Sequence, residues 1–196
     1  MWITDVKYSP DEGKLMEMSS ADGRIYLHDS DNYELKVVTQ KIPQTIVAFD
    51  WDVAGEHLQC TTNDFRLLFF TVEDGKAVTN NAKLRDTVWS TQTCTLGWNV
   101  QGVWPKDDAE KIVNVGKVDR ATKKKLLVSG ADDGSVKVYH YPTQIKDMSY
   151  VEGEGGSNFV SKVKFNSADN TVVSMGANTR AVMQYRLVEP VENGNK

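Results

Sequence analysis

Three histidines are the side chains of this sequence best suited to proton transfer or metal binding: His28, His57 and His140. An imidazole exchanges protons near neutral pH and is a common metal ligand. A metal site needs several ligands at close spacing, whereas these three histidines lie far apart in the chain. We therefore expect the three histidines to be ordinary residues of the scaffold. None of them is expected to be catalytic or to bind a metal.

Aspartates recur where short turns are predicted, at Asp22, Asp64 and Asp133. A carboxylate in such a turn commonly accepts backbone N–H bonds, which favours a structural role. The sequence also lacks a Gly-x-Ser-x-Gly elbow, a Walker loop and a dinucleotide fingerprint. The glycine-rich segment 153–157 opens no helix, and its acidic residues would repel a phosphate, so it is interpreted as a connector. The prediction is a protein with no catalytic residue, no cofactor and no metal.

Positive charge is concentrated in one segment, Lys117–Lys125. Charge runs of this kind are usually solvated loops, here a loop leading into a strand that begins at Leu126. The alternative is a contact for an acidic partner such as a carboxylate-rich peptide tail. In that case the candidate contacts are Lys123, Lys124 and Lys125.

The overall composition is that of a globular protein, with 26% charged and 40% hydrophobic residues. The formal net charge of −4 does not favour nucleic acid or an anionic membrane as a partner. Two cysteines, Cys60 and Cys94, are too few for a disulfide framework, which favours a reducing compartment. No signal peptide and no apolar stretch of ~20 residues is present, so we expect a cytoplasmic protein.

One phrase with alternating apolar residues and a final aromatic recurs four times in the chain. It occupies residues 3–8, 46–51, 100–104 and 160–165 and ends on Tyr8, Trp51, Trp104 and Phe165. Each copy precedes two more extended runs, and the turns at 21–23 and 132–134 contain Asp-Gly, a strong hairpin signal. The first interval fits the ~40–45 residues of a WD40 blade, and the later intervals require insertions.

The predicted fold is therefore all-β, a partial WD40-type β-propeller of four consecutive blades. Outer strands are expected at 35–39, 76–79 and 145–150, and the last blade lacks its own. A closed ring would take that strand from the other end of the chain, so we expect an open arc whose faces accept neighbouring blades. The predicted blades are 1–42, 43–84, 85–152 with an insertion at 85–99, and 153–188, followed by a polar tail at 189–196.

The chain is also rich in tryptophan. Trp51 and Trp104 fall at repeat anchors and are expected in the core. Trp89 and Trp98 lie in the insertion, where they either pack on the propeller or face a partner. Packing is the favoured interpretation.

The insertion has a distinctive order of residues. The segment Arg85–Pro105 contains Arg-Asp-x-x-Trp, then Thr-Cys-x-Leu-Gly, then Gly-x-Trp-Pro, and it closely resembles the echinoderm microtubule-associated protein-like (EMAP-like) family. Flanking phrases are similar as well, among them Asp5–Asp11, Tyr141-Pro142 and Gln184–Arg186. The resemblance covers nearly the whole chain and places it at the C-terminal end of the second propeller of that family.

The resemblance implies a non-enzymatic scaffold segment that contributes to tubulin or microtubule binding in the cytoplasm, at the cytoskeleton. The implied partners are tubulin, other proteins and the remaining blades of a longer chain, with no nucleic acid and no membrane. Because the net charge is acidic, we expect weak binding by this segment alone. The alternatives are a general WD40 scaffold for signalling or ubiquitin ligation, and a propeller enzyme with a metal or carboxylates in its central opening.

Overall fold

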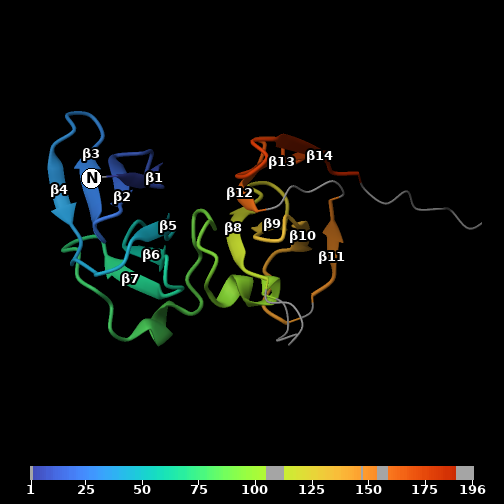
Figure 1. Cartoon of the computed structure of the whole chain (residues 1–196). Helices are drawn as coiled ribbons and strands as arrows, with labels where there is room; N and C mark the ends of the chain where they lie inside the picture. Colours follow the sequence, from blue (N-terminus) through green and yellow to red (C-terminus); the bar gives the residue numbers. More distant parts are fainter. Residues whose placement is uncertain (1, 105–112, 147, 154–158, 189–196) are drawn as a thin grey trace, which may run out of the picture. The chain divides into compact units, whose positions relative to one another are not determined.

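The computed structural model describes residues 2–104, 113–146, 148–153 and 159–188. These residues form fourteen strands in four antiparallel sheets and two short 3-10 helices, which confirms the all-β prediction. The chain divides into two compact units, Met1–Gln101 and Gly102–Lys196, with two sheets in each (Figure 1). Residues 154–157 of the predicted connector and the polar tail lie outside the described residues.

The first unit holds one sheet of four strands and one of three. The strands of the first sheet are β1 (Ile3–Tyr8), β2 (Leu15–Ser20), β3 (Ile25–Asp29) and β4 (Leu35–Val38). Those of the second sheet are β5 (Ile46–Trp51), β6 (His57–Thr62) and β7 (Leu67–Thr71). Within each sheet, every strand pairs with the next one along the chain, as expected for strands joined by short turns.

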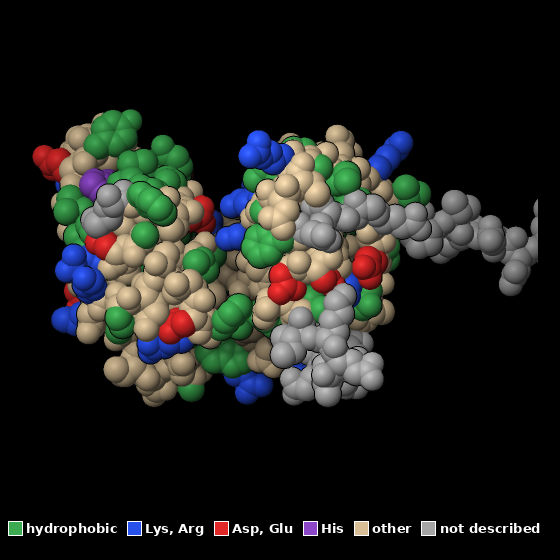
Figure 2. All heavy atoms as spheres, viewed as in Figure 1, with side chains coloured by type: hydrophobic (Ala, Val, Ile, Leu, Met, Phe, Trp, Pro, Cys, Tyr) green, Lys and Arg blue, Asp and Glu red, His purple; other side chains and the backbone are tan. Residues whose placement is uncertain are grey.

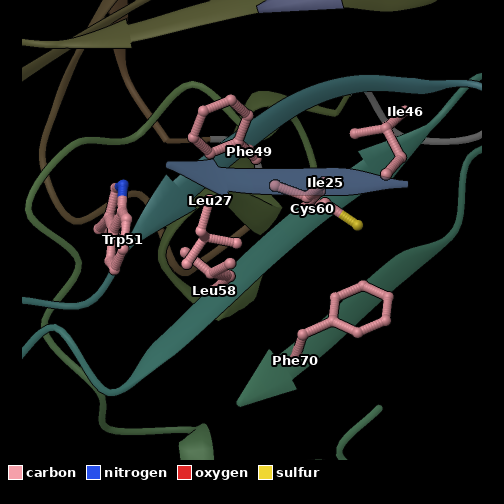
Figure 3. Close-up of a cluster of buried hydrophobic side chains, with 8 residues drawn as sticks. All are labelled: Ile25, Leu27, Ile46, Phe49, Trp51, Leu58, Cys60 and Phe70. Carbon is pink, nitrogen blue, oxygen red and sulfur yellow. The ribbon is translucent and has the colours of Figure 1, made fainter. Parts of the chain in front are cut away.

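The core of the first unit lies between these two sheets. Ile25 and Leu27 project from β3 and are fully buried against the second sheet (Figure 3). Strand β5 is almost entirely buried, and its apolar residues run nearly continuously instead of alternating with polar ones. The buried cluster consists of Ile25, Leu27, Ile46, Phe49, Trp51, Leu58, Cys60 and Phe70.

The second unit repeats this design. Its first sheet contains β8 (Val115–Arg120), β9 (Leu126–Ala131), β10 (Val136–His140) and β11 (Tyr150–Glu152). Its second sheet contains β12 (Val160–Phe165), β13 (Thr171–Gly176) and β14 (Val182–Arg186). The two sheets approach closely at Gly130, where an added Cβ would lie 2.5 Å from a methyl group of Val160. As predicted, the last sheet has three strands in the described part of the chain.

The predicted first strand of the third repeat, 100–104, is wrong. Residues Trp98–Val103 form the 3-10 helix η2, and β8 is the strand that occupies this position in the sheet. Gly102 lies so close to another backbone segment that an added Cβ would be 2.3 Å from the Ile145 carbonyl oxygen. Trp104 is therefore no strand anchor, and it lines a cavity of about 190 Å³ with Tyr139 and Tyr150.

Two predicted outer strands also differ from the structure. Residues 76–79 contribute a single bridge from Ala77 to Phe70, after which the chain turns into the 3-10 helix η1 (Asn81–Leu84). The strand predicted at 145–150 begins only at Tyr150 and continues to Glu152. Both segments are short, and their described residues are mostly exposed, so burial does not enforce a strand register there.

Two glycines with similar backbone angles offer a matched test of the sheet packing. Gly23 (φ 80°) has room for no side chain, because an added Cβ would lie 1.9 Å from the Ile42 carbonyl oxygen. Gly55 (φ 73°) has no such neighbour within 4 Å. We expect Gly55→Ala to lower the free energy of unfolding by about 1–2 kcal/mol, the strain of the left-handed backbone. Gly23→Ala should lower the free energy of unfolding by about 2–3 kcal/mol more than Gly55→Ala does, because the added Cβ also clashes with the backbone. Urea unfolding of the full chain followed by tryptophan fluorescence measures both, and equal losses would contradict this packing.

Candidate interaction surface

The innermost strands of the four sheets, β1, β5, β8 and β12, share one backbone irregularity. In each of them the pairing with the next strand shifts register just after the first residue. The fifth residues of these strands are Lys7, Asp50, Asp119 and Lys164. Lys7 contacts Asp50 at 3.1 Å in the first unit, and Lys164 contacts Asp119 at 3.3 Å in the second. Within each unit, the two sheets are thus joined by one lysine–aspartate pair at the same strand position.

Asp50 is the centre of the larger network. Its carboxylate accepts hydrogen bonds from the Thr91 hydroxyl at 2.6 Å and from the Cys94 backbone N–H at 2.9 Å. The backbone N–H and the hydroxyl of Thr93 also donate to it, each at 2.9 Å. These donors all belong to the insertion predicted at 85–99, which is therefore fixed to the inner strand of the second sheet.

Burial governs the ionisation of this network. Asp50 is fully buried, and desolvation alone would raise its pKa. The Lys7 ammonium and the hydrogen bonds from the insertion instead hold the pKa of Asp50 well below its ordinary value. For Lys7, burial by itself would lower the pKa, but the negative charges of Asp50 and Asp5 raise it above its ordinary value. Both groups therefore stay charged at neutral pH.

Glu17 is a second fully buried carboxyl group near this network. Neither of its carboxyl oxygens has a hydrogen-bond partner in the described part of the chain. Burial raises the pKa of Glu17 well above its ordinary value, although Lys7 opposes this shift. The propeller-enzyme alternative calls for carboxylates that lie near each other, and Glu17 and Asp50 do so. Both side chains are fully buried, however, so a substrate in solvent does not reach them.

The two tryptophans of the insertion pack on the second sheet. Phe69 of β7 stacks with Trp89 at 5.9 Å and with Trp98 at 5.8 Å between ring centroids. Trp89 is buried, and the Ser90 N–H donates to the Trp51 carbonyl at the end of β5. The packing interpretation of Trp89 and Trp98 is confirmed. The division of the chain into four blades at the predicted boundaries stays a prediction, with residues 85–99 in the first compact unit.

The three histidines serve local structure or lie at the surface. The His28 ring bonds to the Tyr33 carbonyl at 3.0 Å, and the His57 ring contacts Asp52 at 3.1 Å. His140 is exposed at the end of β10. Among the described residues, no group of three or more His, Cys, Asp or Glu side chains is arranged to hold a metal ion. Cys60 and Cys94 are buried free thiols.

Two of the three turn aspartates accept the backbone bonds expected of them. Asp22 and Asp133 each accept a backbone N–H two residues further on, from Arg24 and Ser135. Asp64 instead accepts the Thr62 hydroxyl at 2.5 Å. These three carboxylates therefore shape hairpins.

Lys123, Lys124 and Lys125 lie in the turn between β8 and β9, with exposed side chains. The loop predicted from Lys117 is shorter than expected, because Lys117 and Arg120 belong to β8. Asp169, from the turn between β12 and β13, accepts the backbone N–H groups of Lys123 and Lys124, the latter at 3.0 Å. Sequence reasoning missed Asp169 because its partners lie more than forty residues away.

Comparison with known proteins agrees with this architecture. Residues 1–187 match the family model described as the echinoderm microtubule-associated protein second β-propeller. The chain belongs to this family. Among its relatives, human echinoderm microtubule-associated protein-like 1 is 34% identical over 191 residues. The ciliary WD repeat-containing protein ctxp80 of Euplotoides octocarinatus is 31% identical over 187 residues, and the 77 kDa echinoderm microtubule-associated protein of Strongylocentrotus purpuratus is 28% identical over 187 residues.

This member of the family spans about a quarter of the length of these relatives. The matches cover 95%, 94% and 93% of the chain but 23%, 25% and 27% of the three relatives, in the same order. The fold is also that of a solved WD40-type structure, the β-propeller domain of Myceliophteria thermophila Cps50. The TM-score is 0.59 at 8% identity, over 99% of this chain and 55% of that domain. No helix within the described residues is both long and apolar enough to cross a membrane.

Asp50 carries the buried negative charge of the network. We expect Asp50→Asn to lower the free energy of unfolding by about 3–5 kcal/mol, because it leaves the Lys7 ammonium without its buried counter-charge. The pKa of Asp50 is lowered in the folded state, so its contribution is complete above the ordinary value of 3.8 and is lost as the pH falls. Urea unfolding between pH 3 and pH 8 tests both statements, with the exposed Asp31→Asn as the control. A loss no larger than that of the control would refute the role of Asp50.

Glu17 links stability to pH with the opposite sign to Asp50. The pKa of Glu17 is raised in the folded state, so the carboxyl destabilises the fold increasingly as the pH rises above the ordinary value of 4.5. Glu17→Gln should therefore raise stability by about 1–3 kcal/mol at pH 8 and change it little at pH 4. Thermal unfolding across this range is the measurement, and the exposed Glu73→Gln is the control. A stability change for Glu17→Gln that is independent of pH would contradict the assignment.

Proposed function

We propose that this chain is a non-enzymatic propeller segment of a microtubule-associated protein, which contributes to tubulin or microtubule binding in the cytoplasm. The observation that carries the proposal is the match of the second-propeller family over residues 1–187, which includes the insertion. The relatives from human and sea urchin are named as microtubule-associated proteins. Propellers bind partners through loops on a rigid scaffold, and the buried network around Asp50 supplies such rigidity here.

The charged interior supports a binding role more than a catalytic one. Asp50 and Glu17 are fully buried, and Asp50 is occupied by structural donors. A catalytic carboxylate must reach its substrate within hydrogen-bonding distance. Opening the sheets to expose these groups would also break the hydrogen bonds and the ion pair that Asp50 makes in the interior. We therefore assign the buried charged groups to the stability and shape of the fold, and we assign partner binding to the surface of the protein.

The outer face of the first sheet carries exposed hydrophobic side chains, which favours a neighbouring blade as a further partner. Val6 and Met18 are paired across β1 and β2, as are Tyr8 and Met16, and their side chains lie on the face away from β5. Val6 is 48% and Tyr8 60% exposed, and hydrophobic side chains are visible over this sheet in Figure 2. The opposite face of the sheet packs on another sheet, and the chain covers 55% of the solved propeller domain. We propose that the occupant is a further blade of the same architecture.

A co-sedimentation assay of the full chain with microtubules tests the proposed function. We expect weak pelleting that decreases between about 50 and 200 mM salt, because a chain of charge −4 meets an acidic surface through local contacts only. Excess unpolymerised tubulin should compete with the microtubules. Absence of pelleting at low salt would overturn the proposal. Tight pelleting that salt does not weaken would contradict the expected electrostatic mode, and capture of non-cytoskeletal proteins in its place would favour a general WD40 scaffold.

A further inference from the structure

The turn between β8 and β9, residues 121–125, presents three consecutive lysines to solvent. Ala121 is buried and anchors the start of the turn in the core of the second unit. Lys123, Lys124 and Lys125 follow it with exposed side chains. Neither Lys123 nor Lys125 forms an ion pair of its side chain within the described part of the chain. Three positive charges are thus held within one short turn of a protein whose net charge is negative.

A buried carboxylate fixes the backbone of this turn. Asp169 is fully buried and accepts the N–H groups of Lys123 and Lys124, and its carboxylate lies 3.4 Å from the Thr122 hydroxyl. Burial alone would raise the pKa of Asp169, but these bonds lower it, so the group is ionised. Asp169 thus bonds to the backbone of the turn, while the three lysine side chains are exposed.

The other side of the turn is held by β8 and by the segment after β10. The Tyr141 N–H donates to the Lys125 carbonyl at 2.9 Å, and the Arg120 guanidinium lies over the Tyr141 ring at 5.2 Å. Arg120 therefore adds a fourth positive charge beside the turn. The turn is bound at both ends to strands of the second unit, so a ligand that uses it does not have to order it first.

We propose that the lysine turn 121–125, supported by Asp169, is a binding site for a carboxylate-rich peptide segment of a partner protein. The proposal deepens the proposed function, because an acidic segment of tubulin is the partner class that this site would take. Flexible glutamate side chains can each reach one ammonium group, whereas a nucleic acid needs a longer basic track and aromatic groups for stacking. The turn itself contains no aromatic residue.

Binding of a fluorescent poly-glutamate peptide to the full chain, followed by anisotropy at low salt, is the direct test. We expect the triple variant Lys123→Glu, Lys124→Glu, Lys125→Glu to bind about tenfold or more weakly than the wild type. The matched control is Lys14→Glu, Lys41→Glu, Lys83→Glu, which changes three exposed lysines of the first unit and gives the same net charge. Equal losses in the two triple variants, or equal binding of poly-glutamate and a single-stranded oligonucleotide by the wild type, would overturn the proposal.

Asp169→Asn separates the shape of the turn from its charge. This variant is more positive than the wild type, so long-range attraction alone would strengthen binding of poly-glutamate. We expect binding to weaken, because the backbone of the turn loses its ionised acceptor. Unchanged or tighter binding by a folded Asp169→Asn variant would refute the positioning role. If that variant does not fold, the two lysine variants still decide the proposal.

Microtubules with intact and with proteolytically trimmed acidic tails distinguish this inference from the proposed function. The inference predicts that trimming the tails removes the difference between the wild type and the 123–125 variant. A 123–125 variant that pellets like the wild type with intact microtubules would overturn the site and leave the proposed function standing. Loss of poly-glutamate binding in that variant, with no microtubule pelleting by the wild type, would support the site and overturn the function.

Discussion

A lysine–aspartate pair between neighbouring inner strands is the interaction on which the rest of this structure depends. Asp50 is removed from water, and a buried carboxylate is tolerated only when counter-charge and hydrogen-bond donors surround it. Lys7 provides the charge from the first sheet, and the insertion provides the donors. The same position in the second unit holds Asp119 with Lys164, where the Phe165 N–H is an additional donor at 2.8 Å. In the first unit, this network holds the two sheets and the insertion together.

The insertion acquires its role from this requirement. Its Thr and Cys residues supply two hydroxyls and two backbone N–H groups to Asp50. Trp89 and Trp98 hold the same segment on Phe69 by stacking. The polar donors lie in the middle of the segment, with aromatic packing on either side of them. Together they give the insertion a defined position, although it belongs to no strand of the sheets. The most distinctive feature of the sequence is thus part of the folded interior of the first unit.

Buried carboxylates also shape the surface. Asp169 does for the lysine turn what Asp50 does for the insertion, since each accepts backbone N–H groups from a segment remote in the chain. Backbone hydrogen bonds to Asp169 hold the turn, and its lysine side chains are exposed. Rigid sheets with firmly held loops are the usual basis of propeller recognition.

The sequence alone determines the all-β class, most of the strands, the family and the packing of Trp89 and Trp98. These features follow from local alternation, Asp-Gly turns and a specific order of residues in the insertion. Tertiary structure decided which segment became the inner strand of the third sheet. Residues 100–104 and 115–120 both carry apolar residues near strand spacing, and only the second places an aspartate opposite Lys164. It also decided the environments of Asp50, Glu17 and Asp169, because burial and distant hydrogen bonds exist only once the sheets have packed.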